Sequence, residues 1–340
     1  MYRLWGCVWT ISLETARRGS HRILAAMRPE PPQSAETPVR SAVQDALLAW
    51  HHDHGMHAPW RESADPYQAL VAAVMAQQTQ MSRVVPAYER FVAAFPTIES
   101  LAAASRGDVI RVWVGMGYNQ RAVRLHNAAR AIAASGWPRD AASLAEIDGI
   151  GPFTAAIIAS FAFAAPAACV DTNVRRVLGR IIGDEAINGR RLQALADSWL
   201  VTDQPARWNQ ALMDYGARVC TSRPKCDECV VARWCASRER YVTAPLSLVA
   251  EERVVYEARP RRVKKPHPRF EDTARYARGR IVDALRALAP GESVSVGELR
   301  TTIVNGSGPI DASVFDGYID ALERAGLLSR RSRNTVSLPE

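Results

Sequence analysis

Long apolar runs are missing from this sequence of 340 residues. A helix that crosses a bilayer needs ~20 consecutive apolar residues, so a membrane-spanning protein is excluded. The short apolar stretch at the N-terminus is followed by charged residues and by no convincing cleavage site, which argues against a secretory signal peptide. We therefore expect a cytoplasmic, nucleoid-associated protein without a membrane partner. Residues 1–40 are interpreted as a disordered or mis-assigned N-terminal extension, in which Met27 would be the true start if residues 1–26 are not translated.

β-Strand patterning is also missing from most of the chain. No alternation of apolar and polar residues extends over any length before residue 240. Apolar residues recur there at helical spacing instead. The sequence therefore excludes a β-rich core for this part and predicts an all-α one.

Acidic residues are outnumbered by basic ones. The chain has 43 Lys and Arg against 35 Asp and Glu, which gives a formal charge of +8 and an isoelectric point near 9.4. Such an excess favours a polyanionic partner. A solvated basic surface explains the charge equally well, so charge alone does not decide between them.

Cysteine is scarce except in one segment. Of six cysteines, four lie within sixteen residues: Cys220, Cys226, Cys229 and Cys235. In a cytoplasmic protein this density indicates a metal or cluster site rather than two disulfides. Four thiolates can hold a [4Fe–4S] cluster or a tetrahedral zinc ion. We expect Cys169, which stands alone, to be a small buried hydrophobe.

Apolar residues at helical spacing predict a helix over Ser41–His54. Pro59–Arg61 is predicted to follow as an extended elbow. Four histidines gather near the end of that helix: His51, His52, His54 and His57. Because they lie at a helix end and in a loop, we interpret them as a solvated polar face rather than a metal site.

Two polar turns between helices are candidates for nucleic-acid contact. Gln77, Gln78 and Thr79 end an otherwise apolar helix, and Tyr118 follows a glycine-rich turn. Amides and an aromatic ring at such positions suit insertion into a duplex in place of a displaced base. A helix cap or an ordinary loop would also explain the glutamines.

A glycine pair marks a third turn. Gly149, Ile150 and Gly151 separate two helices, and the second helix carries Thr154 in its first turn. Two glycines around one aliphatic residue let backbone N–H groups point outward at a helix N-terminus, which suits a phosphate oxygen. The same turn could simply join two helices. A lone acid, Asp171, follows about twenty residues later beside a second group of arginines.

The C-terminal part changes character. Residues 241–269 form a basic, proline-containing linker, interpreted either as a solvated spacer or as a phosphate-tracking arm. After it the pattern predicts a helix over Thr273–Leu288, a short strand at Val294–Leu299, a helix around Val314–Ala325 and a hairpin over Leu327–Leu338. This order is typical of a winged-helix module, which binds DNA or proteins.

Several motifs occur in the order found in one known family. They are Pro59-Trp-Arg61, Pro66-Tyr67, Val74-Met75 with Gln77-Gln-Thr-Gln80, Trp113 with Gly115-Met-Gly-Tyr118, the turn at 149–151, Val170-Asp-Thr-Asn-Val-Arg-Arg176 and Asn209-Gln-Ala-Leu-Met-Asp214. The chain resembles the MutY-type adenine DNA glycosylases of the endonuclease III, or helix-hairpin-helix, superfamily. Its tail resembles that of actinobacterial members and not the NUDIX-like domain of other members.

The resemblance implies an all-α helix-hairpin-helix glycosylase fold with a small C-terminal α+β module. It places a six-helix barrel at residues 65–170, an iron–sulfur lobe at residues 41–64 and 171–240, and the winged-helix-like domain at residues 270–340. The implied function is removal of mispaired adenine, opposite 8-oxoguanine or guanine, in base-excision repair. The implied partner is double-stranded DNA, bound by a monomer.

The resemblance also implies roles for single residues. Asp171 corresponds to the carboxylate that stabilises the oxocarbenium-like sugar and orients or deprotonates water. As an acid before Thr-Asn, the same residue could be only a helix N-cap. Gly149, Ile150, Gly151 and Thr154 would bind a DNA phosphate. Gln77, Gln78, Thr79, Tyr118 and Phe153 would line the base pocket or enter the duplex.

Two residues depart from the family pattern. Phe153 stands where the endonuclease III lyases have a lysine, so no amine is available for a Schiff base and we expect no strong strand-nicking activity. Ala73 stands where MutY enzymes have the glutamate that protonates adenine. Either Glu62 or Tyr118 replaces that acid, or the substrate is uracil or thymine, which leave more readily. A third alternative is a lesion-binding protein without catalytic activity.

The cysteine spacing is close to the family's cluster motif. The gaps are five, two and five residues, whereas the first gap in the family is normally six. The resemblance implies that Cys220, Cys226, Cys229 and Cys235 bind a [4Fe–4S] cluster, with zinc as the alternative.

Overall fold

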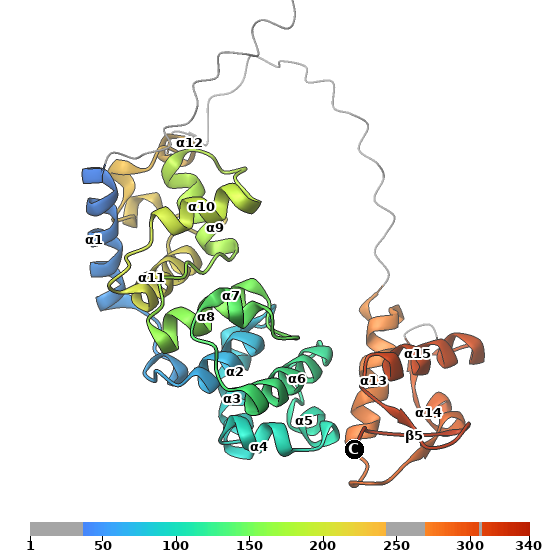
Figure 1. Cartoon of the computed structure of the whole chain (residues 1–340). Helices are drawn as coiled ribbons and strands as arrows, with labels where there is room; N and C mark the ends of the chain where they lie inside the picture. The colour runs from blue at the N-terminus through green and yellow to red at the C-terminus, as the bar shows by residue number, and fades with distance from the viewer. Residues whose placement is uncertain (1–36, 243–268, 306–307) are drawn as a thin grey trace, which may run out of the picture.

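The protein is described by a computed structural model that covers residues 37–242, 269–305 and 308–340. Three large apolar cores organise these residues, and Figure 1 shows the corresponding groups of helices. Residues 1–36 and most of the predicted basic linker, residues 243–268, lie outside the described residues. No helix within the described part is both long and apolar enough to span a bilayer.

The first core lies between seven helices in the middle of the chain. These are α2 (Pro66–Ala76), α3 (Met81–Ala94), α4 (Ile98–Ala103), α5 (Arg106–Val112), α6 (Gln120–Ser135), α7 (Ala141–Ala145) and α8 (Pro152–Phe163). Helices α2 and α8 are apolar on nearly all sides and pack against each other, as expected of helices enclosed by others. Asp65 starts α2 by accepting a hydrogen bond from the Tyr67 backbone N–H at 2.8 Å.

The second core combines segments from both sides of the first. Its helices are α1 (Thr37–His54), α9 (Thr172–Ile182), α10 (Gly189–Ser198) and α11 (Pro205–Arg218), followed by the turns η2 (Cys226–Glu228) and η3 (Ala232–Trp234) and by α12 (Arg238–Val242). Helix α1 lies against α11 although they are far apart in sequence (Figure 1). The Arg40 and Gln44 side chains of α1 donate to the Ser198 and Trp199 carbonyls, both at 2.9 Å.

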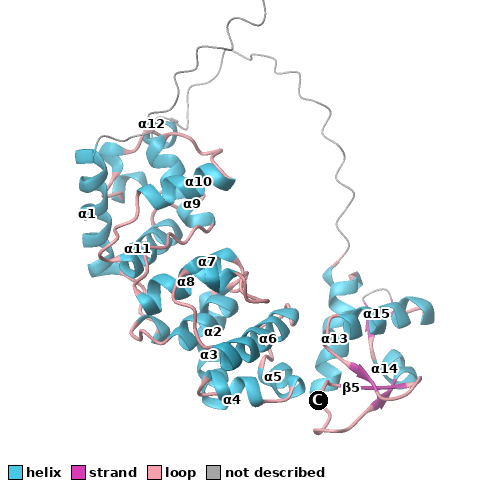
Figure 2. Cartoon of the chain, in the orientation of Figure 1, coloured by secondary structure: helices cyan, strands magenta, loops and turns pink. Residues whose placement is uncertain are grey.

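The third core belongs to the C-terminal module, which holds all the strands of the described chain (Figure 2). Its elements are η4 (Phe270–Asp272), α13 (Ala274–Arg286), β1 (Val294–Ser295), α14 (Val296–Thr302), β2 (Val304–Asn305), β3 (Gly308–Pro309), α15 (Ala312–Arg324), β4 (Ser329–Arg330) and β5 (Thr335–Ser337). The three-stranded antiparallel sheet has the order β1-β5-β4. Val294 pairs with Val336, and Ser329 pairs with Ser337.

The C-terminal module is docked on the helices of the first core, α2–α8, which we call the barrel. Ile110 of α5 and Val123 of α6 belong to the module's own apolar core. Arg286 of α13 donates from Nε to the Ile110 carbonyl at 2.8 Å and from Nη2 to Asn119 Oδ1 at 2.9 Å. The Gly107 backbone N–H donates to the Pro339 carbonyl at 2.7 Å, so the chain's C-terminal end lies beside α5 (Figure 1). Barrel and module therefore share one continuous interface.

The helical prediction and the terminal hairpin are confirmed, and two local predictions are wrong. Pro59–Arg61 is a 3₁₀ turn rather than an extended elbow, because the Arg61 N–H bonds back to the Ala58 carbonyl at 2.9 Å. The strand predicted over Val294–Leu299 ends at Ser295. That serine accepts a hydrogen bond from the Glu298 N–H at 3.0 Å and starts α14.

Candidate active site

Asp171 lies at the N-terminus of α9, directly after the segment that connects the first core to the second. Its Oδ1 accepts hydrogen bonds from the backbone N–H groups of Asn173 at 2.8 Å and Val174 at 2.7 Å. Its Oδ2 accepts from the Asn173 side-chain amide at 2.8 Å. Asp171 is therefore a helix N-cap, as its sequence context allowed. Three hydrogen bonds also fix the orientation of this half-buried carboxylate, so capping and catalysis do not exclude each other.

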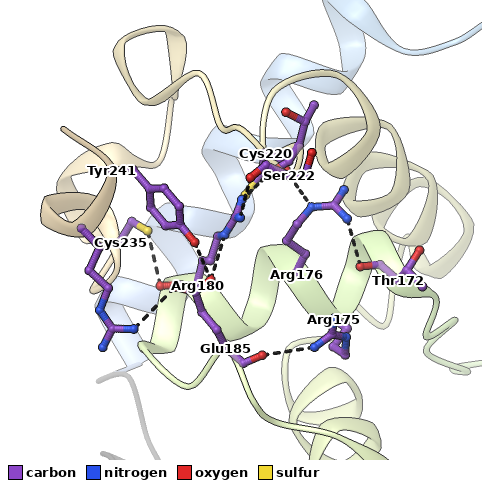
Figure 3. Close-up of polar contacts among 11 residues, drawn as sticks. Thr172, Arg175, Arg176, Arg180, Glu185, Cys220, Ser222, Cys235 and Tyr241 are labelled. Atoms are coloured by element: carbon purple, nitrogen blue, oxygen red, sulfur yellow. Dashed lines mark hydrogen bonds and ion pairs between the residues drawn. The ribbon is translucent and has the colours of Figure 1, made fainter. Parts of the chain in front are cut away.

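A chain of hydrogen bonds connects Asp171 to the cysteine segment. The Asn173 side-chain oxygen accepts from Arg176 Nη2 at 2.7 Å, and Arg176 Nε donates to the Cys220 carbonyl at 2.6 Å. Figure 3 shows Arg176 reaching from α9 to the Cys220 loop. Gly216 lets α11 lie close to the start of α9, because a Cβ at that position would lie 2.6 Å from the Asn173 Cβ. Folding of the cysteine segment thus helps to set the position of the Asp171 carboxylate.

Ala73 lies in an apolar cluster that also contains Cys169, two residues before Asp171 in the sequence. The Ala73 cluster consists of Ala73, Ala156, Ile157 and Cys169, with Phe153 packed on it from α8. The Cys169 thiol is fully buried, as predicted, and burial raises its pKa to about 12. Asp214 is the only buried carboxyl side chain among the described residues, and it is ion-paired. No buried acid of the described chain is therefore free to replace the missing glutamate.

The two suggested substitutes for that acid lie elsewhere. Glu62 lines a cavity of about 260 Å³ beside His51 and Arg61, and Ala73 and Asp171 are outside its lining. The Tyr118 ring is 43% exposed and faces two guanidinium groups. Neither position gives support for proton delivery next to Ala73.

Arg121 holds the two polar turns together, a role that the sequence did not reveal. This buried arginine donates to the carbonyls of Val74, Met75, Gln77, Met116 and Gly117 and to the Thr79 hydroxyl, over 2.5–3.5 Å. Burial lowers its pKa to about 10, which leaves it charged at neutral pH. Arg121 thereby fixes the turn with Gln77, Gln78 and Thr79 against the turn that ends at Tyr118.

Both turns carry unusual backbone geometry. Gln78 has φ of 53° and Tyr118 has φ of 43°, a left-handed conformation that side chains other than glycine rarely adopt. Both side chains are exposed. Strain of this kind persists only where the surroundings impose it, and it gathers at functional positions. The predicted insertion residues thus occupy two braced turns that project their side chains outward.

The glycine turn has one packed side and one open side. Gly149 has φ of 95°, and a Cβ there would lie 2.5 Å from the Arg124 carbonyl oxygen. Gly151 precedes α8 with ordinary backbone angles, and a Cβ there would meet nothing within 4 Å. The Ile150 side chain is buried in the first core, and its backbone N–H already donates to the Ile147 carbonyl at 3.0 Å, so Ile150 shapes the turn and has no N–H free for a phosphate.

Thr154 is less available than predicted. Its side chain is buried, and its hydroxyl accepts a hydrogen bond from the Gln77 side-chain amide at 3.3 Å. The hydroxyl therefore connects the glycine turn to the glutamine turn within the protein. Only the backbone N–H of Thr154 remains for a phosphate at the start of α8.

The four clustered cysteines line one small cavity. Cys220, Cys226, Cys229 and Cys235 surround it together with Arg180 and Tyr241. Arg180 Nη1 lies 3.4 Å from Cys220 Sγ, and the Tyr215 hydroxyl lies 3.0 Å from Cys229 Sγ. Burial raises the pKa of Cys235 to about 11. Nowhere in the described ranges do three metal-ligating side chains converge as a single ion requires. Four thiols around one cavity are a donor set that suits a sulfur-ligated metal group.

A buried ion pair was also missed from the sequence. Arg61 donates to both carboxylate oxygens of Asp214, at 2.6 and 2.9 Å, and the Met56 N–H adds a third bond at 2.8 Å. His51 Nε2 lies 3.6 Å from the same carboxylate, with only 12% of its side chain exposed. The prediction of a solvated histidine face is therefore wrong for His51, because α1 packs on α11 and encloses it. In the sequence, the motifs Pro59-Trp-Arg61 and Asn209–Asp214 were the features that could have indicated this ion pair.

Comparison with known proteins agrees with this geometry. Residues 71–200 match the family described as HhH-GPD superfamily base excision DNA repair protein. The adenine DNA glycosylase of Mycolicibacterium smegmatis is 37% identical over 251 residues, covering 71% of this chain and 79% of that protein. That of Mycobacterium tuberculosis is 35% identical over 266 residues, covering 75% of this chain and 82% of that protein. The chain belongs to the adenine DNA glycosylase family.

Solved structures place this adenine DNA glycosylase family member in the same fold. A thermostable thymine-DNA glycosylase superimposes with a TM-score of 0.58 at 27% identity, covering 61% of this chain and all of that one. Endonuclease III in a trapped covalent intermediate with DNA gives a TM-score of 0.51 at 20% identity, covering 60% of this chain and 96% of that one. The helix-hairpin-helix fold prediction is confirmed. As a member of the adenine DNA glycosylase family, the protein is a DNA N-glycosylase whose partner is DNA.

Proposed function

We propose that the protein hydrolyses the N-glycosidic bond of adenine mispaired with 8-oxoguanine or guanine in duplex DNA. The observation that carries this proposal is the Asp171 carboxylate, held by three hydrogen bonds at the start of α9. It is supported by relatives that are adenine DNA glycosylases at 35–37% identity over most of the chain.

The chemistry requires a negative charge near the sugar. Departure of the base builds positive charge on the deoxyribose, and a fixed carboxylate stabilises that charge without having to reorganise. Asp171 is held in one orientation by backbone N–H groups and by Asn173. We assign to it the stabilisation of the oxocarbenium-like state and the orientation or deprotonation of water.

The base that leaves depends on whether a proton can be supplied to it. Ala73 offers no proton, and the Ala73 cluster around it is apolar. Uracil and thymine leave more readily as anions than adenine does. A second candidate function is therefore excision of uracil or thymine from mismatches with guanine. It is favoured by Ala73 and by the likeness to a thymine-DNA glycosylase at 27% identity.

Strand nicking is not expected from this site. Phe153 is half-buried against the Ala73 cluster, at the position where a lyase would carry its amine. Without an amine there is no Schiff base, and β-elimination at the abasic site loses its catalyst. We propose a monofunctional enzyme that leaves an intact abasic strand.

The glycine turn and the two braced turns are proposed to bind DNA. The backbone N–H groups of Gly149 and Gly151 and of Thr154 at the start of α8 would hold a phosphate, since the open side of Gly151 admits one; Ile150 would keep the turn in shape through its own bond to the Ile147 carbonyl. Gln78 and Tyr118 would enter the duplex, since both project from turns fixed by Arg121. Extrusion of a base leaves a gap that such side chains fill.

The cysteine site is proposed to hold a [4Fe–4S] cluster. Cys220, Cys226, Cys229 and Cys235 all line one cavity, and cysteine thiolates are the ordinary ligands of such clusters. The cluster would fix the loop that accepts the Arg176 hydrogen bond and so stabilise the second core. We further propose that the three apolar cores correspond to a cluster lobe, a barrel and a winged-helix-like domain.

The cluster is tested by composition and colour. Purified protein should be brown and contain about four iron and four sulfide per chain. Substituting Cys226→Ser in η2 should lower the iron content and the midpoint of thermal unfolding. A colourless protein that contains zinc and no iron would refute the cluster.

The substrate is tested with four labelled duplexes that carry A opposite 8-oxoguanine, A opposite G, U opposite G and T opposite G. Alkali cleaves any abasic site formed, and omitting alkali tests for nicking by the protein itself. Adenine release supports the first function, and uracil or thymine release alone supports the second. Asp171→Asn serves as the inactive control. Binding without release from any duplex would reject both and leave a lesion-binding protein.

A further inference from the structure

An aromatic and guanidinium stack joins the barrel to the C-terminal module. The Arg275 guanidinium carbon lies 4.0 Å from the centre of the Tyr118 ring and 5.9 Å from that of Phe270. Tyr118 belongs to the barrel, whereas Arg275 and Phe270 belong to α13 and η4 of the module. Tyr118 and Phe270 are 43% and 55% exposed, and Arg275 is exposed as well. We call these three residues the Tyr118–Arg275 platform.

Both sides of the platform are held in place. On the barrel side, Arg121 donates to the Met116 and Gly117 carbonyls and so fixes the turn before Tyr118. On the module side, Arg286 of α13 donates to the Ile110 carbonyl at 2.8 Å and to Asn119 Oδ1 at 2.9 Å. Asn119 directly follows Tyr118. The module is therefore anchored within one residue of the turn on which Arg275 stacks.

The surroundings of the platform are basic. Residues 269–280 contain four arginines against two carboxylates, and the first turn of α13 has no acid. Arg278 is exposed one turn after Arg275 on the same helix. Stacking on an aromatic ring holds the plane of a guanidinium group and leaves its N–H edge available to a phosphate. A negatively charged partner fits this surface better than a basic or apolar one does, and the phosphates of DNA meet that condition next to the turn that is proposed to enter the duplex.

We propose that Arg275 contacts a backbone phosphate of duplex DNA next to the site entered by Tyr118, which makes the C-terminal module part of the DNA-binding face. This inference rests on the proposed function in one respect, namely that Tyr118 faces DNA. A winged-helix module binds DNA or protein partners. We favour DNA because Arg275 stacks on Tyr118, which is itself proposed to enter the duplex. The barrel alone therefore presents an incomplete binding face.

The test measures binding by the full-length protein to a duplex with a tetrahydrofuran abasic analogue, which no glycosylase cleaves. Kd is determined at several KCl concentrations for wild type, Arg275→Ala, Arg275→Lys and Arg90→Ala. Arg90 is an exposed arginine of α3 whose side chain donates only to the Pro86 carbonyl, and it serves as the matched loss of charge.

Loss of one phosphate contact should raise Kd about tenfold at moderate salt and reduce the slope of log K against log salt concentration by about one. Arg275→Ala should show both effects. Arg275→Lys should keep the slope and lose part of the affinity, because lysine does not stack as a plane. Arg90→Ala should match wild type, and all variants should unfold at the wild-type temperature because the substituted side chains are exposed.

An Arg275→Ala variant with the wild-type Kd and slope would overturn the inference. A raised Kd with an unchanged slope would also overturn it, since the contact would then not be with phosphate. Failure of the proposed function has a different signature. Wild-type protein would bind the analogue duplex with the expected dependence on Arg275 but release no base from the four substrate duplexes.

Discussion

Arg61 donates to both carboxylate oxygens of Asp214, at 2.6 and 2.9 Å, across 153 positions of sequence. The pair fixes the 3₁₀ turn η1, which leads into the barrel, against α11 of the second core. Only 11% of the Arg61 side chain and 8% of the Asp214 side chain are exposed. Removing one partner of such a pair leaves a buried charge without compensation, which typically costs about 3–5 kcal/mol.

The pair predicts a dependence of stability on acid pH. Burial alone would raise the pKa of Asp214. The His51 imidazole, the Arg61 guanidinium and the Met56 N–H outweigh burial and hold that pKa well below its usual value. An aspartate whose pKa is lowered by folding stabilises the protein above its unfolded pKa of about 3.9, and that stability is lost as the pH falls below it.

Unfolding by urea between pH 6 and pH 3 measures this effect. The free energy of unfolding of wild type should fall more steeply below about pH 4 than that of Asp214→Asn. The asparagine variant should be less stable at pH 6, because Arg61 loses its counter-charge. Parallel curves for the two proteins would contradict the assignment.

One pair of variants separates the helix cap made by Asp171 from its proposed catalytic role. Asparagine caps helices about as well as aspartate does, whereas loss of an N-cap to alanine costs about 1 kcal/mol. Asp171→Asn should therefore keep the backbone cap bonds and the DNA affinity and lose only the bond from the Asn173 amide, so stability should fall less than in Asp171→Ala while base release falls by orders of magnitude. Asp171→Ala should lose stability as well as base release. Wild-type turnover by Asp171→Asn would remove the catalytic role and leave only the cap.

A carboxyl group at position 73 is expected to speed up the release of adenine. Ala73→Glu places a carboxyl group in the Ala73 cluster, where desolvation raises its pKa and keeps its proton available. A positioned general acid contributes about 10²- to 10⁴-fold, so single-turnover release of adenine should increase. Ala73→Gln has the same size without the proton and serves as control. Equal rates for the two variants would show that protonation does not limit the reaction.

The glycine turn predicts opposite outcomes for its two glycines. Gly149→Ala forces a side chain into positive φ and against the Arg124 carbonyl, so it should destabilise the fold by more than about 1 kcal/mol. Gly151→Ala meets no protein atom and should leave stability within about 0.5 kcal/mol of wild type. Its methyl group would stand where a phosphate approaches, so DNA affinity should fall. Unchanged affinity in Gly151→Ala would place the phosphate elsewhere.

Local patterns in the sequence were sufficient for most of the helices. The apolar periodicity placed α1, α13 and α15 within a few residues of their observed bounds. The strand predicted over Val294–Leu299 was misjudged because its apolar residues are too few to distinguish a strand from a capped helix. Ser295 decides the matter through a hydrogen bond to the Glu298 N–H, and periodicity does not record such a bond.

The site was harder to predict because its members come from distant segments. Asp171 and the glycine turn were recognisable, since each carries its role within a few residues. Arg121 was not, because its acceptors lie 42–47 residues earlier in the chain or in the preceding turn. The burial of His51 depends likewise on the packing of α1 against α11, two helices separated by most of the described chain.

The position of Arg121 has a consequence for how the two turns move. One guanidinium group anchors the turn at Gln77–Thr79 and the turn at Met116–Tyr118, so neither can shift without breaking bonds that also hold the other. The positions of Gln78 and Tyr118 are thus coupled through Arg121. In the proposed DNA complex the two residues would enter and leave the duplex as a unit, held by a single side chain.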